Sequence, residues 1–138
     1  MKPQEITTDA TSGIIRFTSP WSFNETVERI EALFKAKKIK LFARIDQAAE
    51  AAAVGLVLRH TTLLIFGDPA KGTPLMDAHP SLAIDLPLKA LVWETATGEV
   101  YIGLTSPEFL QHRHGLPNAP FAEVVRLFTT LINSGSQP

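Results

Sequence analysis

The sequence has no cysteine among its 138 residues, which excludes disulfides, thiolate nucleophiles, iron–sulfur clusters and cysteine-ligated zinc. It also lacks an excess of either charge, because 13 Lys and Arg stand against 14 Asp and Glu. A net charge of −1 is not typical of a polyanion binder, so we expect no nucleic-acid partner. No apolar run reaches the roughly 18 residues of a membrane span, and the start lacks the apolar stretch of a signal peptide. We therefore expect a soluble cytoplasmic protein with no membrane partner.

What is present fits one ordinary globular domain, since 45% of the residues are hydrophobic. We expect this single domain to span residues 1–138, with its core over residues 13–133. A polar lead-in (1–12) and a polar tail (134–138) are expected to flank the core.

Five segments have the β-branched, aromatic or alternating content of strands. The run after His60 is the most uniformly apolar and predicts a central strand, whereas the one that starts at Gly13 suits a sheet edge. The last two are separated by a four-residue loop and predict a hairpin. The five segments are residues 13–18, 39–45, 61–66, 89–95 and 100–105.

Four segments predict helices, and three of them follow a residue suited to capping an N-terminus. Ser22 and Glu25 have the spacing of a capping box ahead of a long amphipathic stripe. Asp46 and Ser106 precede two shorter helices, the first of which Gly55 closes. The expected helices cover residues 23–38, 47–54, 107–112 and 121–132.

Between the third and fourth strands, residues 67–87 contain four prolines and two glycines. This composition predicts a loop, with at most a helical turn near Leu75 and Met76. The order of elements is then strand, helix, four strands and helix. It predicts an α+β domain, in which helices pack on a single antiparallel-rich sheet.

The chain contains six distinctive motifs, at residues 22–27, 42–46, 63–69, 72–76, 83–89 and 113–115. Together they resemble the prokaryotic domain-of-unknown-function family 302. The resemblance implies a β-α-β4-α fold similar in topology to the TATA-binding-protein half-domain, and it implies a homodimer. It implies no activity. Family members commonly have His where Gln47 follows Asp46, and often Pro where this chain has His60.

The motif-dense loop that begins at Gly67 is the first candidate site. Its glycines and Lys71 partly resemble a phosphate-binding loop, but Lys71 precedes Gly72 instead of following it, and Pro74 removes a backbone donor. The competing interpretation is ordinary turn chemistry. Because motifs concentrate in this loop, we expect a small anionic or apolar ligand between sheet and loop. Its expected contacts are Arg44, Asp46, Phe66, Gly67, Gly72, Thr73, Met76, Asp85 and Lys89.

A small hydrolase or isomerase is the alternative hypothesis, in which Asp46 and Asp85 act as acid and base with His60 or His114. The structural interpretation of the same residues is that Asp46 caps a helix and Asp85 fixes a turn. Ion pairs of Asp85 with Lys89, or of Asp46 with Arg44, are equally ordinary. We assign no catalytic residue.

Metal and cofactor chemistry has little support in the sequence. His112 and His114 diverge on a helix, and with no cysteine only remote carboxylates can complete a zinc site. Ser81 lies in a plain turn context with no nucleophile elbow around it. We expect no metal and no cofactor. A third hypothesis is a scaffold whose motif loop builds the dimer interface through Phe66 or Met76.

Overall fold

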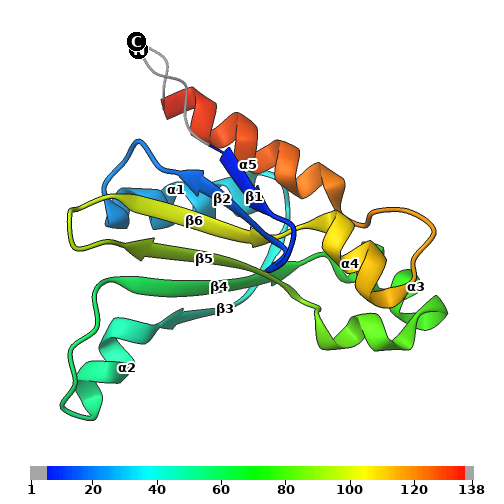
Figure 1. The fold of residues 1–138 in the computed structure, drawn as a ribbon, viewed down its shortest axis with the longest axis horizontal. Coiled ribbons are helices and arrows are strands. Elements are labelled where there is room, and N and C mark those ends of the chain that lie inside the picture. The colour runs from blue at the N-terminus through cyan, green and yellow to red at the C-terminus, as the bar shows by residue number, and fades with distance from the viewer. Residues whose placement is uncertain (1–5, 136–138) are drawn as a thin grey trace.

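The computed structural model describes residues 6–135, which form one six-stranded antiparallel sheet (Figure 1). The strand order is β1-β2-β6-β5-β4-β3. Each strand is antiparallel to its neighbours. The strands are β1 (Ile6–Asp9), β2 (Ile14–Thr18), β3 (Lys40–Asp46), β4 (Thr61–Gly67), β5 (Leu88–Glu94) and β6 (Val100–Thr105).

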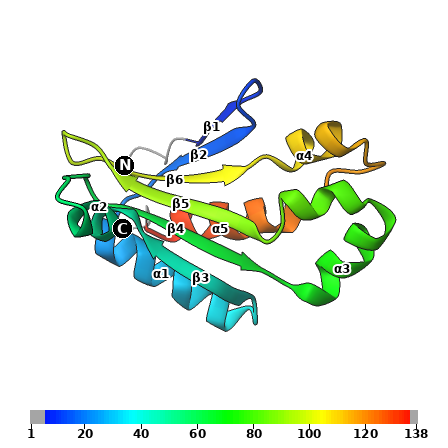
Figure 2. The ribbon, with the colours of Figure 1, turned by 90° about the horizontal axis from the view of Figure 1, so that it is seen from below.

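Two long helices, α1 (Phe23–Ala36) and α5 (Ala122–Gly135), cover the same face of the sheet (Figure 2). Alternate residues of the strands point toward them, so that one side of each inner strand is buried. The core consists of Ile15, Phe17, Phe23, Val27, Ile30, Phe34, Leu64, Phe66, Ala90, Val92, Val100, Ile102, Leu104, Phe128 and Ile132.

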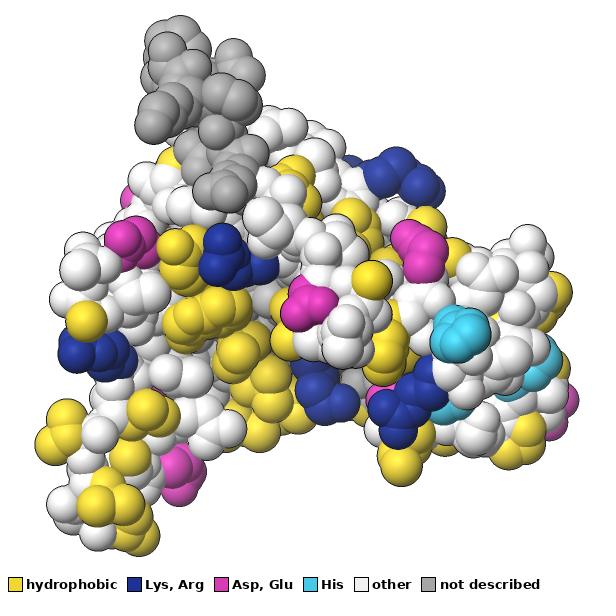
Figure 3. Space-filling view, viewed as in Figure 1, with side chains coloured by type: hydrophobic (Ala, Val, Ile, Leu, Met, Phe, Trp, Pro, Cys, Tyr) yellow, Lys and Arg dark blue, Asp and Glu magenta, His cyan; other side chains and the backbone are white. Residues whose placement is uncertain are grey.

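The other face of the sheet carries no helix within the described residues and faces the viewer in Figure 1. Strand register places Gly103, Leu91 and Leu63 in one row across it. The guanidinium of Arg16 lies over the Tyr101 ring, 4.3 Å from its centroid. This open face is partly apolar, as Figure 3 shows.

The local signals in the sequence explain where α1 and α2 (Gln47–Ala53) begin. Ser22 Oγ accepts the backbone N–H of Glu25 at 3.2 Å, and Asp46 Oδ1 accepts that of Ala49 at 2.9 Å. These bonds satisfy backbone donors that have no partner inside the helix. Gly55 follows α2 with φ +78°, a left-handed conformation that glycine adopts without strain.

The predicted α+β fold and its β-α-β4-α order are confirmed by β2, α1, β3 to β6 and α5. The likeness to the TATA-binding-protein half-domain stays a prediction. The expected lead-in was wrong from Ile6 onward, because residues 6–9 form β1. Consequently β2 pairs on both sides and is not an edge strand. β1 is exposed along its length, so it has no apolar alternation to reveal it. Of the expected tail, Ser134 and Gly135 belong to α5, and residues 136–138 lie outside the described residues.

The expectation of a loop over residues 67–87 was also wrong. The segment contains α3 (Pro69–Ala78) and a 3-10 helix, η1 (Pro80–Ile84). Both begin with a proline in the first turn, where its missing N–H has no helical partner to lose. Asp68 Oδ1 caps α3 by accepting the Ala70 N–H at 3.0 Å. Pro69 and Pro80 are therefore helix starts, whereas Pro74 lies inside α3 and Pro87 lies between η1 and β5.

The hairpin of β5 and β6 is confirmed, and α4 (Pro107–His114) follows it. Ser106 caps α4 as predicted, and Gly115 ends it with φ +63°. In Figure 1, α3 and α4 gather beyond one end of the strands, and α2 lies at the opposite end. No helix in residues 6–135 is long and apolar enough to cross a membrane.

Candidate functional site

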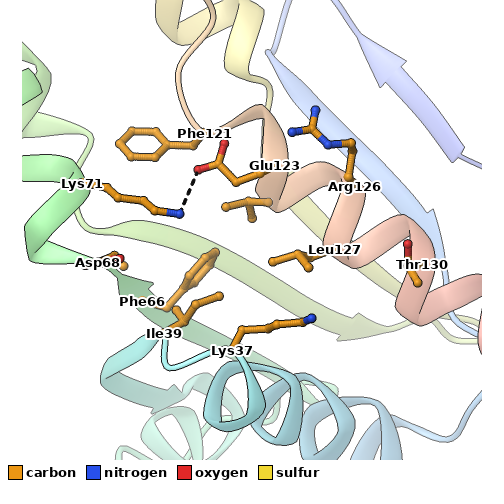
Figure 4. A pocket seen from close by; sticks show the side chains of 12 residues that line it. Lys37, Ile39, Phe66, Asp68, Lys71, Phe121, Glu123, Arg126, Leu127 and Thr130 are labelled. Atoms are coloured by element: carbon orange, nitrogen blue, oxygen red, sulfur yellow. Dashed lines mark ion pairs between the residues drawn. The ribbon is translucent and has the colours of Figure 1, made fainter.

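A hollow of about 370 Å³ opens where β4 ends, between β4, α3 and α5 (Figure 4). Buried Phe66 forms part of its floor and stacks on Phe34 with ring centroids 4.4 Å apart. Three cationic and two anionic side chains surround this floor, so we call it the cationic hollow. Its lining residues are Lys37, Ile39, Phe66, Gly67, Asp68, Lys71, Phe121, Glu123, Val124, Arg126, Leu127 and Thr130.

A second hollow of about 290 Å³ adjoins the first on the α3 side. Only Asp68 and Thr73 contribute polar side chains to it, so we call it the apolar hollow. Its size and that of the cationic hollow are those of small-molecule sites in proteins. The lining residues are Phe42, Gly67, Asp68, Pro69, Gly72, Thr73, Met76, Leu86, Pro87, Leu88 and Phe121.

Gly67, Asp68 and Phe121 line both hollows and so form their common wall. The Asp68 carboxylate accepts the Ala70 N–H and so caps α3. Phe121 has φ +60°, a left-handed backbone conformation that is strained for an aromatic residue. Its position just before α5 places the ring beside the mouth of the cationic hollow in Figure 4. A strained residue on the wall between two hollows is typical of a functional position.

The charges around the cationic hollow come from three different elements. Lys71 of α3 and Glu123 of α5 face each other, with Nζ 3.8 Å from Oε1. Both side chains are largely exposed, so this ion pair contributes little to stability. Lys37 at the end of α1 and Arg126 of α5 add two further positive charges. Cations therefore outnumber the carboxylates of the lining.

Five of the residues predicted from the sequence come together at this site. Phe66 and Gly67 line the cationic hollow, and Gly67, Gly72, Thr73 and Met76 line the apolar one. A Cβ added at Gly72 lies 3.6 Å from Leu86 Cδ1 and 3.8 Å from Met76 Cε, which shows how closely α3 borders the apolar hollow.

The other four predicted residues do not line the two hollows. Arg44 Nη1 donates to Glu31 Oε2 at 2.7 Å, and Asp46 caps α2. Lys89 lies on the open face of the sheet, beside Leu91 and Trp93. The expected ion pairs of Asp46 with Arg44 and of Asp85 with Lys89 do not form among the described residues. Arg44 pairs with Glu31 of α1, and Asp85 contacts residues of α4.

Asp85 lies in a separate cluster with His114, Ser81 and Arg113. Asp85 Oδ2 is 2.5 Å from His114 Nε2, and Ser81 Oγ is 2.8 Å from His114 Nδ1. Arg113 Nε lies 3.5 Å from the same carboxylate oxygen. Ser81 was set aside as a turn residue, and nothing in its local sequence reveals this contact. The cluster joins η1 to the end of α4.

The paired-carboxylate arrangement of the enzyme hypothesis does not form. Asp46 is opposite Thr62 on β4, whereas Phe66 is opposite Leu88, which follows Asp85 in the chain. Four residues of strand separate Thr62 from Phe66, about 13 Å at about 3.3 Å per residue. The two carboxylates thus lie toward opposite ends of β4. His60 stacks instead on the Phe23 ring, with ring centroids 5.0 Å apart.

Within residues 6–135, no three His, Asp or Glu side chains lie close enough together to hold a metal ion. Sequence reasoning also missed residues that border the hollows, among them Lys37, Phe121 and Glu123. Each belongs to an element whose local pattern predicts only a helix end or a helix start. They meet the motif loop solely through the packing of α1 and α5 on the sheet.

The fold and the two hollows define a small α+β protein with a candidate binding site beside its sheet. The sequence profile of the family described as domain of unknown function DUF302 matches residues 15–134, and the chain belongs to this family. An uncharacterized conserved protein DUF302 from Bacillus stearothermophilus has a similar crystal structure, with a TM-score of 0.74. The match covers 87% of this chain and 95% of that chain. At 18% identity, it shows the fold alone.

Curated relatives include proteins named fluoride-specific ion channel FluC 1. The protein of Brucella suis biovar 1 is 40% identical over 105 residues, which are 76% of this chain and 41% of that protein. The protein of Brucella abortus biovar 1 is equally similar, and 39% of its length is matched. This chain therefore spans about two fifths of the length of the curated relatives it matches.

Proposed function

We propose that this chain is a binding module for a small organic ligand, held in the cationic and apolar hollows. The adjoining hollows at the end of β4 are the observation that carries this proposal. Five residues selected from sequence motifs line them, and the strained Phe121 forms their common wall. Walls that combine an apolar surface with several charged side chains suit a site for a small organic ligand.

A thermal-shift screen across a metabolite panel tests this proposal. A ligand that binds the folded state raises the melting temperature, by several degrees when its concentration is about 100 times Kd. Met76→Trp fills the apolar hollow and is expected to abolish the shift. Lys89→Gln, which alters the open face, is the matched control and is expected to retain it. A panel that shifts nothing, or a shift that Met76→Trp leaves unchanged, contradicts the proposal.

We also propose that the chain forms a homodimer, and an exposed arm supports this. The arm comprises residues 54–58, where Val54, Leu56, Val57 and Leu58 are 72%, 65%, 100% and 47% exposed. Such a contiguous apolar run is typical of an interface. Light scattering should give twice the chain mass, and Val57→Asp should reduce it to one. Thr97→Asp, a charge added to the exposed hairpin loop, should leave the dimer intact. A monomeric parent protein contradicts the proposal.

The relatives named fluoride channels support a second candidate function, in which this chain associates with such a channel and alters its fluoride efflux. In those proteins, a region similar to this chain accompanies about three fifths of further sequence. Co-purification with a fluoride channel in detergent, and fluoride efflux with and without this chain, test the candidate. Association and altered efflux would support it. Independent elution together with unchanged efflux would overturn it.

A further inference from the structure

We infer that the ligand of this site is an amphipathic organic anion, with its charged group in the cationic hollow and its apolar body in the apolar hollow. This inference rests on the proposed function and specifies the ligand class. It follows from the contrast between two hollows that share a wall.

The apolar hollow has no positively charged side chain in its lining. Its lining is hydrophobic apart from Asp68 and Thr73, and the Asp68 carboxylate already accepts the Ala70 N–H. A polar ligand placed here would lose its hydration and find hydrogen-bond partners only at Asp68 and Thr73. The apolar hollow therefore selects an alkyl or aromatic group.

The cationic hollow suits an anionic group. Among the described residues, Lys71 forms one ion pair, a long contact of 3.8 Å with Glu123. An ammonium group has three N–H donors, so this pair leaves donors that a ligand can use. Lys37 reaches the opposite side of the same floor (Figure 4). A carboxylate or phosphate in this hollow gains charge-assisted hydrogen bonds from such an ammonium group that a neutral group cannot make.

The shared wall allows one molecule to occupy both hollows. Gly67 has no side chain, and a Cβ there would lie 3.7 Å from Phe42 Cε2 and 3.8 Å from Pro87 Cβ. A side chain at this position would project toward Phe42 and Pro87 and so take up space in the apolar hollow. The Phe121 ring borders both spaces and provides an aromatic contact where the head meets the body.

Calorimetric titration with three probes tests this inference. Decanoate has a carboxylate and a long alkyl chain, decanol has the alkyl chain without the charge, and acetate has the carboxylate without the long chain. We expect decanoate to bind more tightly than decanol, and acetate not to bind measurably. Lys37→Gln with Lys71→Gln should weaken decanoate about tenfold and leave decanol unchanged. The double variant Lys35→Gln with Lys89→Gln removes two cations elsewhere and is the matched control.

Glu123→Gln provides a test of opposite sign, because it removes the carboxylate that competes for Lys71. It should tighten decanoate about threefold and leave decanol unchanged. If decanol or another neutral compound binds as well as decanoate, the anion inference is overturned while the proposed function stands. If Met76→Trp affects no probe, or nothing binds at all, both are overturned.

Discussion

His114 Nε2 lies 2.5 Å from Asp85 Oδ2, although 29 residues of chain separate the two. The His114 side chain is 4% exposed, and its other ring nitrogen contacts Ser81 Oγ. Since a carboxylate only accepts hydrogen bonds, Nε2–H donates to Asp85, and Nδ1 shares a second hydrogen bond with the Ser81 hydroxyl. One imidazole thus connects η1 to α4.

Replacing His114 with alanine should destabilise the protein by about 1–3 kcal/mol, because Ser81 and Asp85 both lose their hydrogen bond to the imidazole and Asp85 keeps only the longer contact with Arg113. Urea denaturation measures this free energy of unfolding. His112→Ala changes an exposed histidine on the same helix, and we expect a change of no more than about 0.5 kcal/mol. Equal effects of the two variants would show that the contact does not stabilise the fold.

Of the enzyme hypothesis, the described residues retain the contact between Asp85 and His114, and Ser81 joins it as a residue that the hypothesis did not include. None of the hollows described above is lined by Ser81. We therefore expect Ser81→Ala to leave any background hydrolysis of p-nitrophenyl acetate unchanged. A serine-dependent loss of that activity would instead identify Ser81 as a nucleophile and restore a hydrolase function.

Gly72→Ala should stabilise the protein by about 0.5–1 kcal/mol, since alanine is the better helix former and its methyl group meets only ordinary contacts. It also narrows the apolar hollow, so ligand affinity should fall as stability rises. Gly13→Ala is the contrasting variant. Its Cβ would lie 2.3 Å from Phe109 Cγ at φ +73°, so we expect destabilisation. Thermal unfolding distinguishes the two signs, and a destabilised Gly72→Ala would contradict this account of α3.

The contribution of the turn between β1 and β2 to stability should depend on pH, because Asp9 titrates there. Backbone hydrogen bonds from Ser12 and Thr11 hold the pKa of Asp9 below its ordinary value of 3.8. A carboxylate with a lowered pKa in the folded state contributes stability above the unfolded pKa and loses it as pH falls through the folded one. Asp9→Asn should thus be less stable than the parent near pH 7, with the difference vanishing in acid. A carboxyl titration by NMR with a midpoint at or above 3.8 would refute this.

Glu99 in the hairpin loop between β5 and β6 should titrate in the same direction. Hydrogen bonds from the hydroxyls of Thr95 and Thr97 lower its pKa from the ordinary value of 4.5. Thr95→Val removes the first of these donors, so the Glu99 pKa should move back toward 4.5. NMR titration of the Glu99 carboxyl in both proteins measures the shift, and identical midpoints would exclude the role assigned to Thr95.

Much of the fold was predictable because its signals are local. A capping side chain such as Ser22 or Asp46 bonds a backbone group three residues away, so the sequence contains both partners. The stripe from Phe23 to Phe34 likewise reflects one helix face. β1 was missed because its exposed residues carry no apolar alternation, and α3 because the initial proline of a helix resembles a breaker.

By itself, the sequence determined the order of β2, α1, β3 to β6 and α5, the N-caps of α1, α2 and α4, and the motif-dense segment that begins at Gly67. It could not determine which residues face that loop, because the walls of the hollows combine α1, β4, α3 and α5. Only tertiary packing places Lys37 and Phe121 on the same hollow as Gly67. Packing likewise decides that Asp85 pairs with His114 and not with Lys89. Periodicity and capping act over a few residues, whereas a cavity and its charges arise where distant segments meet.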